Sequence, residues 1–208
     1  MFKRLCIQFW ESYRMNGLVA TFREIVFINR ELIVMENDLS TLGSTMKSLP
    51  ELNMEFIEIS KYNFEKFHLK YPFRSRYLKA LKNLNNGFRS FVVSRGNEVI
   101  GDTWCATSIN SKPASLPVDL KWFGIDLGEK GAYLFDMFVN TQERKNSVAI
   151  YLISLALHSL REKGFIKIYG YVWVDNSQAS FLYRIFRFKE LKRMKASRFL
   201  FFKRVRDV

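Results

Sequence analysis

Metal-binding and disulfide-forming residues are scarce in this sequence. Its 208 residues include two cysteines, Cys6 and Cys105, and two histidines, His68 and His158. Two cysteines so far apart do not make a disulfide framework, and so few potential ligands argue against a metal site. The simplest setting for such a chain is reducing and cytoplasmic.

Long apolar runs are also missing. No stretch reaches the roughly 20 consecutive apolar residues that a membrane-spanning helix needs. Residues 1–14 mix charged and apolar side chains and lack a cleavage site of small residues, unlike a secretory signal. We find no internal repeat and no low-complexity segment, so the length fits one domain, or one domain with an extension.

Acidic residues are outnumbered by basic ones. Lys and Arg total 33 against 20 Asp and Glu, which gives a formal net charge of +13. This charge favours an anionic partner, such as a nucleotide cofactor, an acidic carrier protein, a membrane surface or nucleic acid. Hydrophobic residues make up 48% of the chain and include 20 Phe, which is ample for an aromatic core.

Residues 132–188 carry the clearest pattern of secondary structure. They indicate a strand, a polar loop, a helix, a second strand and a second helix, over residues 132–139, 140–146, 148–163, 166–174 and 177–185. Gly164 ends the first helix, and Asp175 or Asn176 can cap the second. This order predicts a right-handed crossover that joins two parallel strands.

Two motifs lie in this segment. Residues 144–149 read Arg-Lys-Asn-Ser-Val-Ala, and residues 176–188 read Asn-Ser-Gln-Ala-Ser-Phe-Leu-Tyr-Arg-Ile-Phe-Arg-Phe. Their order, spacing and flanking strands resemble the acyl-CoA binding core of the GNAT N-acetyltransferase superfamily. The family has glycine where this chain has Lys145, Ser147 and Arg187, so its pyrophosphate loop is degenerate here.

The resemblance implies an α+β, acyl-CoA N-acyltransferase fold. Its centre would be a mixed sheet of about seven strands flanked by helices. We place this domain at residues 51–208 and treat residues 1–50 as an extension of amphipathic helices and a linker. Further predicted elements are a short strand at 31–35, a helix at 62–70, a long loop at 108–130 and a closing antiparallel pair at 189–192 and 197–203.

The loop before the longer helix carries the predicted cofactor site. Free N–H groups and the positive end of a helix dipole attract a pyrophosphate, and small side chains such as Ser147 and Ala149 let it approach. The alternative is an ordinary helix start with solvated charges. The residues expected to bind acetyl-CoA or another acyl-CoA are Met137, Phe138, Val139, Arg144, Lys145, Asn146, Ser147, Val148, Ala149, Asn176 and Ala179. The first three are expected to act through their backbone N–H groups.

The resemblance also implies catalytic roles. Tyr183 is the expected general acid that protonates the leaving thiolate, unless it merely packs in the core. Asp136 lies in an apolar strand, where burial is expected to raise its pKa and suit it to a role as general base or substrate ligand. Glu98 and Asp102 are weaker candidates, and water is another route for the proton. Asn176 either holds the pantetheine arm or caps its helix.

The N-terminal region is open to two interpretations. Residues 1–28 place apolar side chains at helical spacing, with a break at Gly17. These helices either pack on the domain or on a second copy of it, forming a homodimer, or lie in a membrane interface. In the latter case Trp10 inserts among lipids, basic residues face lipid phosphates, and the cytoplasmic protein is peripheral to the membrane.

Two classes of function follow. The first is an N-acyltransferase, with acetyl as the favoured group, acting on an amine of a small-molecule acceptor; an acyl carrier protein is an alternative donor. The second is a non-catalytic binding protein that uses its basic surface on membrane or nucleic acid, of which nucleic acid is disfavoured. Acceptor recognition is expected in residues 62–76, around Trp122 and in the last hairpin, which suit an anionic or amphiphilic acceptor.

Overall fold

The computed structural model describes residues 2–22, 27–43, 53–109, 116–143, 147–199 and 202–208. The α-helices are α1 (Phe2–Thr21), α2 (Arg74–Asn85), α3 (Val118–Phe123), α4 (Val148–Glu162) and α5 (Ser177–Ile185). Short 3-10 helices are η2 (Leu39–Thr41), η4 (Phe64–Phe67) and η6 (Thr141–Glu143). The strands are β1 (Phe27–Asp38), β2 (Glu55–Ile59), β3 (Arg89–Arg95), β4 (Glu98–Thr107), β5 (Gly131–Val139), β6 (Lys167–Trp173), β7 (Lys189–Phe199) and β8 (Phe202–Asp207).

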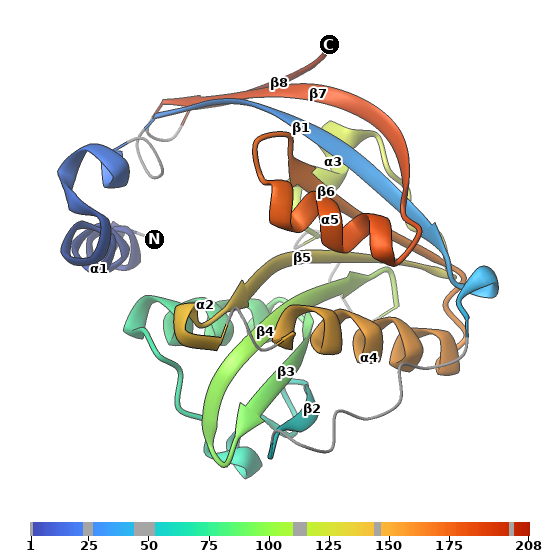
Figure 1. The fold of residues 1–208 in the computed structure, drawn as a ribbon, viewed down its shortest axis with the longest axis horizontal. Coiled ribbons are helices and arrows are strands. Elements are labelled where there is room, and N and C mark those ends of the chain that lie inside the picture. The colour runs from blue at the N-terminus through green and yellow to red at the C-terminus, as the bar shows by residue number, and fades with distance from the viewer. Residues whose placement is uncertain (1, 23–26, 44–52, 110–115, 144–146, 200–201) are drawn as a thin grey trace.

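The strands form one 8-stranded sheet in the order β2-β3-β4-β5-β6-β1-β7-β8 (Figure 1). β5 and β6 pair in parallel, and the other neighbouring strands pair antiparallel. The predicted α+β fold with a mixed sheet between helices is therefore confirmed. The sheet is wider than expected because a long strand near the N-terminus joins it.

That strand, β1, lies inside the sheet between β6 and β7. It pairs with β6 along its second half and with β7 along most of its length. Leu32 and Val34 are almost fully buried, so the predicted short strand at 31–35 is the centre of a 12-residue strand. The domain boundary at residue 50 stays a prediction, and the segment before it contributes β1 to the common sheet.

The helices divide between the two faces of the sheet. On one face, Leu152 of α4 packs in the same cluster as Leu134 of β5. On the other, Leu84 of α2 packs with residues of β3 and β4, and Leu120 of α3 packs with Tyr133 of β5. Tyr133 and Leu134 are neighbours in one strand and point to opposite faces, as the pleat requires. We call these the α4/α5 face and the α2/α3 face.

Three predicted elements differ from the structure. The helix predicted at 62–70 is reduced to η4, and the loop predicted at 108–130 contains α3, which packs on the sheet. The closing hairpin turns after Phe199 rather than after residue 192, because β7 continues with Met194 and Ala196 buried against β1. Each difference arises from packing against the sheet, which local periodicity does not record.

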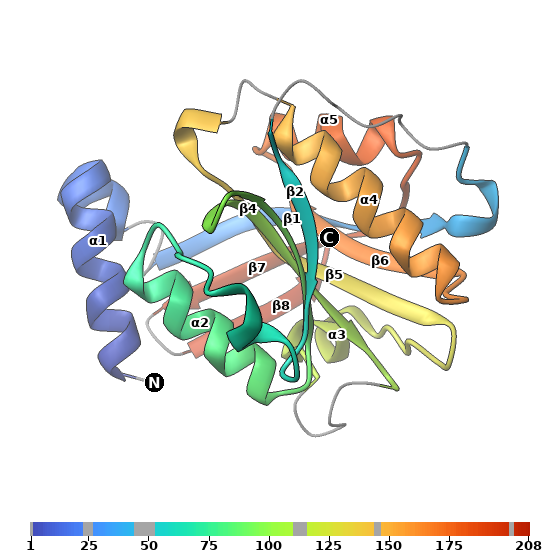
Figure 2. The same ribbon diagram turned by 90° about the horizontal axis from the view of Figure 1, so that it is seen from below.

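α1 stands to one side of the sheet, beside α2 (Figures 1 and 2). The carboxylate of Glu11 accepts a hydrogen bond from the Ser75 N–H, 3.3 Å away in the first turn of α2. Gly17 has a φ of 77° and kinks the helix where a break was predicted. The side chains of Trp10 and Leu18 are 53% and 59% exposed. Within the described ranges, no helix is long and apolar enough to cross a membrane.

Candidate active site

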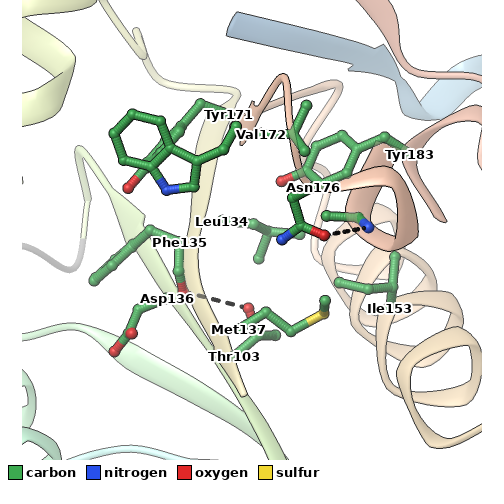
Figure 3. Close-up of a pocket in the computed structure, with 12 residues that line it drawn as sticks. Thr103, Leu134, Phe135, Asp136, Met137, Ile153, Tyr171, Val172, Asn176 and Tyr183 are labelled. Carbon is green, nitrogen blue, oxygen red and sulfur yellow. Dashed lines mark hydrogen bonds between the residues drawn. The ribbon is translucent and has the colours of Figure 1, made fainter. Parts of the chain in front are cut away.

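β5 and β6 separate soon after they begin to pair. Within these two strands the parallel pairing runs from Gly131 to Tyr133 of β5 and stops there. A cavity of about 310 Å³ opens beyond that point (Figure 3). Its lining residues are Thr103, Leu134, Phe135, Asp136, Met137, Ile153, Tyr171, Val172, Trp173, Asn176, Ala179 and Tyr183. Some of them belong to the α4/α5 face and others to the α2/α3 face, so residues from both faces of the sheet line the cavity.

A β-bulge shapes the β5 side of this cavity. The register between β4 and β5 shifts between Asp102 and Trp104, so Asp136 and Met137 both lie opposite Thr103. Asp136 has a φ of 56°, in the left-handed region that non-glycine residues seldom adopt. Such a bulge bends its strand and strengthens the local twist. β5 therefore turns at the point where it leaves β6.

Arg76 of α2 holds the bulge in place. Its Nε donates to Asp102 Oδ1 at 2.9 Å, and its Nη2 donates to the backbone oxygen of Asp136 at 2.8 Å. Its Nη1 lies 3.2 Å from Asp136 Oδ1, and Lys79 Nζ lies 2.6 Å from Asp136 Oδ2. Trp104 Nε1 donates to the second oxygen of Asp102 at 3.1 Å. Two cations thus balance two carboxylates beside the bulge.

The two carboxylates of this cluster titrate differently. Burial raises the pKa of Asp102 to about 6, against the opposing effect of Arg76. Burial also opposes ionisation of Asp136, but Lys79 and Arg76 together hold its pKa below its ordinary value. The expected rise in the pKa of Asp136 is therefore wrong, because the sequence did not reveal the two cations that α2 brings. Figure 3 shows the Asp136 side chain directed away from Tyr183.

Tyr183 lines the cavity from α5. Its ring packs against Phe188 with centroids 4.5 Å apart, and its hydroxyl points into the cavity (Figure 3). A Cβ atom at Gly170 would lie 2.4 Å from that hydroxyl, so glycine in β6 makes room for it. Burial raises the pKa of Tyr183 well above its ordinary value, which keeps the phenol protonated. Its role as general acid stays a prediction.

The other predicted donor-binding residues spread over three elements. Asn176 caps α5 through its Oδ1, which accepts from the Ala179 N–H at 3.0 Å, and both residues line the cavity. Met137 also lines it. The Phe138 ring instead lies under the Arg76 guanidinium, 4.9 Å away, and Val139 is buried. Phe138 therefore faces α2 with its side chain, which leaves its backbone as the group for the predicted role.

The start of α4 keeps the backbone shape that glycine would favour. Ser147, its N-cap residue, has a φ of 55°. Arg187 also stands where the family has glycine, and it has a φ of 57°. Val148 is buried against Gly101, where an added Cβ would lie 3.1 Å from Val148 Cγ1. Ala149 is half-buried in the first turn. The predicted residues Arg144, Lys145 and Asn146 lie outside the described residues.

Sequence reasoning missed the cluster around Arg76. Residues 62–76, which include Arg76, were assigned to acceptor recognition, and Lys79 was given no role. A Lys three residues after an Arg is a common pattern on solvated helices and carries no signal by itself. Trp122 was expected in the long loop at 108–130; it is half-buried in α3 and packs in the cluster that contains Leu120 and Tyr133. These placements follow from how α2 and α3 dock on the sheet.

A comparison with known protein families shows to which family this chain belongs. Residues 53–188 match the family model described as Acetyltransferase (GNAT) family. The chain belongs to the GNAT acetyltransferase family. GNAT proteins are acetyltransferase enzymes, and the expectation of such an enzyme is confirmed at this level. No curated protein matches the sequence.

Several solved structures share the GNAT fold of this chain. One is a GCN5-related glucosamine N-acetyltransferase region in a fungal multi-domain GH3 β-N-acetylglucosaminidase, with 17% identity and a TM-score of 0.59 over 91% of this chain and 23% of that one. A Drosophila protein has 12% identity and a TM-score of 0.52 over 90% of this chain and 57% of its own. A GCN5-related N-acetyltransferase from Sphaerobacter thermophilus has 13% identity and a TM-score of 0.51 over 86% and 55%. The chain thus spans little more than half of these proteins, or less, and the likeness concerns the fold.

The residues of this GNAT cavity fit an acyl-CoA. Its volume of about 310 Å³ lies at the lower end of the range for small-molecule pockets. Leu134, Ile153 and Val172 give apolar walls, while Asn176 and Tyr183 add polar groups. A slender chain with amide groups, such as the pantetheine arm, matches that mixture. The N-terminal turn of α4 offers backbone N–H groups for a phosphate.

Proposed function

We propose that this protein transfers an acyl group, with acetyl as the favoured one, from acyl-CoA to an amine of a small-molecule acceptor. The observation that carries the proposal is the cavity between the separated parts of β5 and β6, with the Tyr183 hydroxyl pointing into it. A cavity lined from both faces of the sheet lets donor and acceptor approach from opposite faces. Such placement lowers the barrier by fixing the two reactants in position.

Each group of the site has a proposed task. Acyl-CoA, when bound, supplies an acyl group activated as a thioester. The N–H groups of Ser147, Val148 and Ala149 bind the pyrophosphate, supported by the α4 dipole. Asn176 and Ala179 flank the pantetheine arm, and the backbone of the β5 bulge at Met137 stabilises the acyl oxygen. The residues therefore bind, orient and polarise the donor.

Two protons move during the transfer, and each takes its own route. As the acceptor nitrogen bonds to the acyl carbon, the carbon–sulfur bond breaks and the sulfur takes the proton of Tyr183. The acceptor nitrogen loses a proton in the same step. Asp136 is a weak base because Lys79 and Arg76 lower its pKa, so we assign that proton to water and give Asp136 the substrate-facing role.

Donor binding is the direct test of this function. A ligand at 100 times its dissociation constant stabilises a protein by about 2.7 kcal/mol. We expect CoA, acetyl-CoA or a long-chain acyl-CoA to raise the melting temperature by roughly 5–10 °C at that excess. Ser147→Glu should abolish the shift by placing a carboxylate at the phosphate site, while Asn85→Glu, at the exposed end of α2, should not. No shift with any thioester would leave the non-catalytic binding protein as the better account.

An acyl carrier protein is the second candidate donor. The net charge of +13 favours an acidic carrier. Such a donor would depend less on the phosphate site at Ser147. If acyl carrier protein supports turnover that Ser147→Glu leaves unchanged, while acetyl-CoA does not support it, the donor is the carrier.

We also propose that α1 binds an anionic membrane surface. Trp10, Leu18 and Val19 are 53%, 59% and 67% exposed, which is unusual for large apolar side chains on one short segment. Arg14 lies over the Trp10 ring, 4.9 Å from its centroid, so a cation accompanies the aromatic side chain. An anionic lipid surface matches both the apolar side chains and the basic charge of the chain. A second copy of the chain is the other possible occupant.

A further inference from the structure

A second cavity lies at the far end of α4 and α5. It measures about 210 Å³ and lies between the end of β1, η2, α4 and the C-terminal end of α5. The residues that matter for its chemistry are Asn37, Leu42, Ser154, His158, Ile185 and Phe186. It shares no lining residue with the cavity between β5 and β6. In Figure 1 both helices run toward η2, so their C-terminal ends lie on the η2 side and the two cavities flank opposite parts of the helix pair.

Asn37 brings to this cavity a buried acceptor that has no hydrogen-bond partner among the described residues. Its side chain is 3% exposed, and its Nδ2 donates to the backbone oxygen of Phe186 at 2.6 Å. Since a carbonyl oxygen only accepts, this bond fixes the orientation of the amide. Its Oδ1 is buried, and the described residues provide no hydrogen-bond donor for it. Buried polar atoms are normally satisfied, so this oxygen calls for an N–H or O–H from a bound molecule.

His158 and Ser154 add complementary groups from α4. They are 7% and 3% exposed and both line the cavity. His158 Nδ1 lies 3.2 Å from Nη2 of Arg161. Because a guanidinium only donates, Nδ1 must be the bare nitrogen, and the ring proton sits on Nε2. The His158 ring is therefore a donor toward a ligand, and the Ser154 hydroxyl can donate or accept.

The size and polarity of the cavity further limit the kind of ligand that fits it. A cavity of about 150 Å³ is known to hold a benzene molecule. The larger space here therefore suits one six-membered ring with one small substituent. Leu42, Ile185 and Phe186 supply apolar walls. Arg187 is the charged residue among the lining residues and is exposed, so the interior favours a neutral ligand.

We propose that this cavity binds a neutral, single-ring molecule that carries an N–H donor beside a carbonyl acceptor. The donor bonds Asn37 Oδ1, and the acceptor receives hydrogen bonds from both the His158 ring and the Ser154 hydroxyl. Nicotinamide and uracil have this chemistry and this size. The proposal stands apart from the acyltransfer proposal, although Ser154 directly follows Ile153, which lines the other cavity.

Ligand-observed NMR with nicotinamide and uracil tests the proposal. We expect at least one probe to bind, and expect its N,N-dimethyl or 1,3-dimethyl derivative to bind at least about tenfold more weakly, because methylation removes the donor. Ser154→Ala should weaken binding about fivefold or more. Ser159→Ala, on the same helix but outside the cavity, should not change it.

Four results would overturn the proposal. One is that neither probe binds the full chain. Another is that the methylated derivatives bind as well as their parents. The third is that Ser154→Ala and Ser159→Ala behave alike. The fourth is a crystal structure soaked with either probe that contains ordered water alone in the cavity. Alanine favours helix, so Ser154→Ala should fold even if Asn37→Ala does not.

Discussion

Tyr183 owes its position to a glycine in the neighbouring strand. Its hydroxyl points into the cavity where Gly170 of β6 leaves room, and burial keeps it protonated. We predict that Tyr183→Phe lowers kcat by about 10²–10⁴-fold, the usual contribution of a general acid. The melting-temperature shift with CoA should stay as in the parent, because the ring remains. Steady-state release of CoA thiol measures the first quantity.

Two further variants make this test specific. Tyr13→Phe changes a tyrosine of α1 that is 41% exposed and lies outside the segments assigned to donor or acceptor binding, so it should leave kcat unchanged. Gly170→Ala should lower kcat as Tyr183→Phe does, because the new Cβ displaces the hydroxyl. If Tyr183→Phe turns over at the parent rate, the phenol is a packing residue.

Asp102 predicts how stability varies with pH. Its pKa is about 6 in the folded protein and about 3.9 when unfolded, so between these values the folded state binds more protons. The Asp102 contribution to the free energy of unfolding therefore falls as pH rises from about 4 to 6. We expect the stability of the parent relative to Asp102→Asn to fall over this window in urea titrations. A relative stability that is constant or rises with pH would contradict the assignment.

Ser147 and Arg187 show what replacing glycine costs. Both keep a positive φ, which costs an L residue roughly 1–2 kcal/mol. Glycine loses about 0.5–1 kcal/mol more entropy on folding. Ser147→Gly and Arg187→Gly should therefore each raise the free energy of unfolding by about 0.5–1 kcal/mol. Ser180→Gly, inside α5, should lower it by about 0.5 kcal/mol, and equal effects at all three sites would refute the argument.

At the scale of elements, α1 stands apart because none of its described side chains belongs to a core cluster. Its side toward α2 is anchored by Glu11 at the Ser75 N–H, while Trp10, Leu18 and Val19 face solvent. We predict that the protein co-sediments with phosphatidylserine vesicles, and that changing these three residues to Ser lowers the bound fraction at least about tenfold, because the apolar contribution is lost. Phosphatidylcholine vesicles and Tyr62→Ser are the controls. Unchanged sedimentation of the triple variant would assign α1 to protein contacts instead.

The parting of β5 and β6 is also a property of elements. It depends on the bulge at Asp136, on Arg76 of α2 bonding the Asp136 backbone oxygen, and on the end of parallel pairing at Tyr133. β6 alternates between more and less buried residues and β5 is apolar along most of its length, so neither pattern alone predicts the separation. The bulge is held because α2 meets β4 and β5 there, and the guanidinium of Arg76 links α2 to both strands through several bonds at once.

For the whole molecule, the central place of β1 has a consequence for truncation. β1 fills the space between β6 and β7, and its Leu32 and Val34 are buried. We predict that a fragment of residues 51–208 shows no cooperative thermal unfolding, because β6 and β7 lose their shared partner. A fragment of residues 27–208 keeps β1 and should unfold cooperatively. Cooperative unfolding of the shorter fragment would show that residues 51–208 are an independent domain.

The sequence by itself determined the order of elements from β5 to α5. The signals are local: the periodicity, the helix end at Gly164 and the Asn176 cap. Local features can be recognised in the sequence without knowing the fold. The same is true of the two motifs, whose spacing the helices and strands impose. These features were enough to indicate the family and to single out Tyr183 as the expected general acid.

The tertiary structure alone decided the position of β1 and the pairing of Arg76 and Lys79 with Asp136. It also decided the burial of the Asn37 oxygen, which has no partner within the described ranges. Each joins residues far apart in the chain, and the free energy of such contacts depends on burial and on the partner's charge. Asp136 shows the effect most clearly, because an apolar strand alone would raise its pKa and two cations from α2 lower it. A sequence pattern records which residues are present, whereas the surrounding charges and solvent set their chemistry.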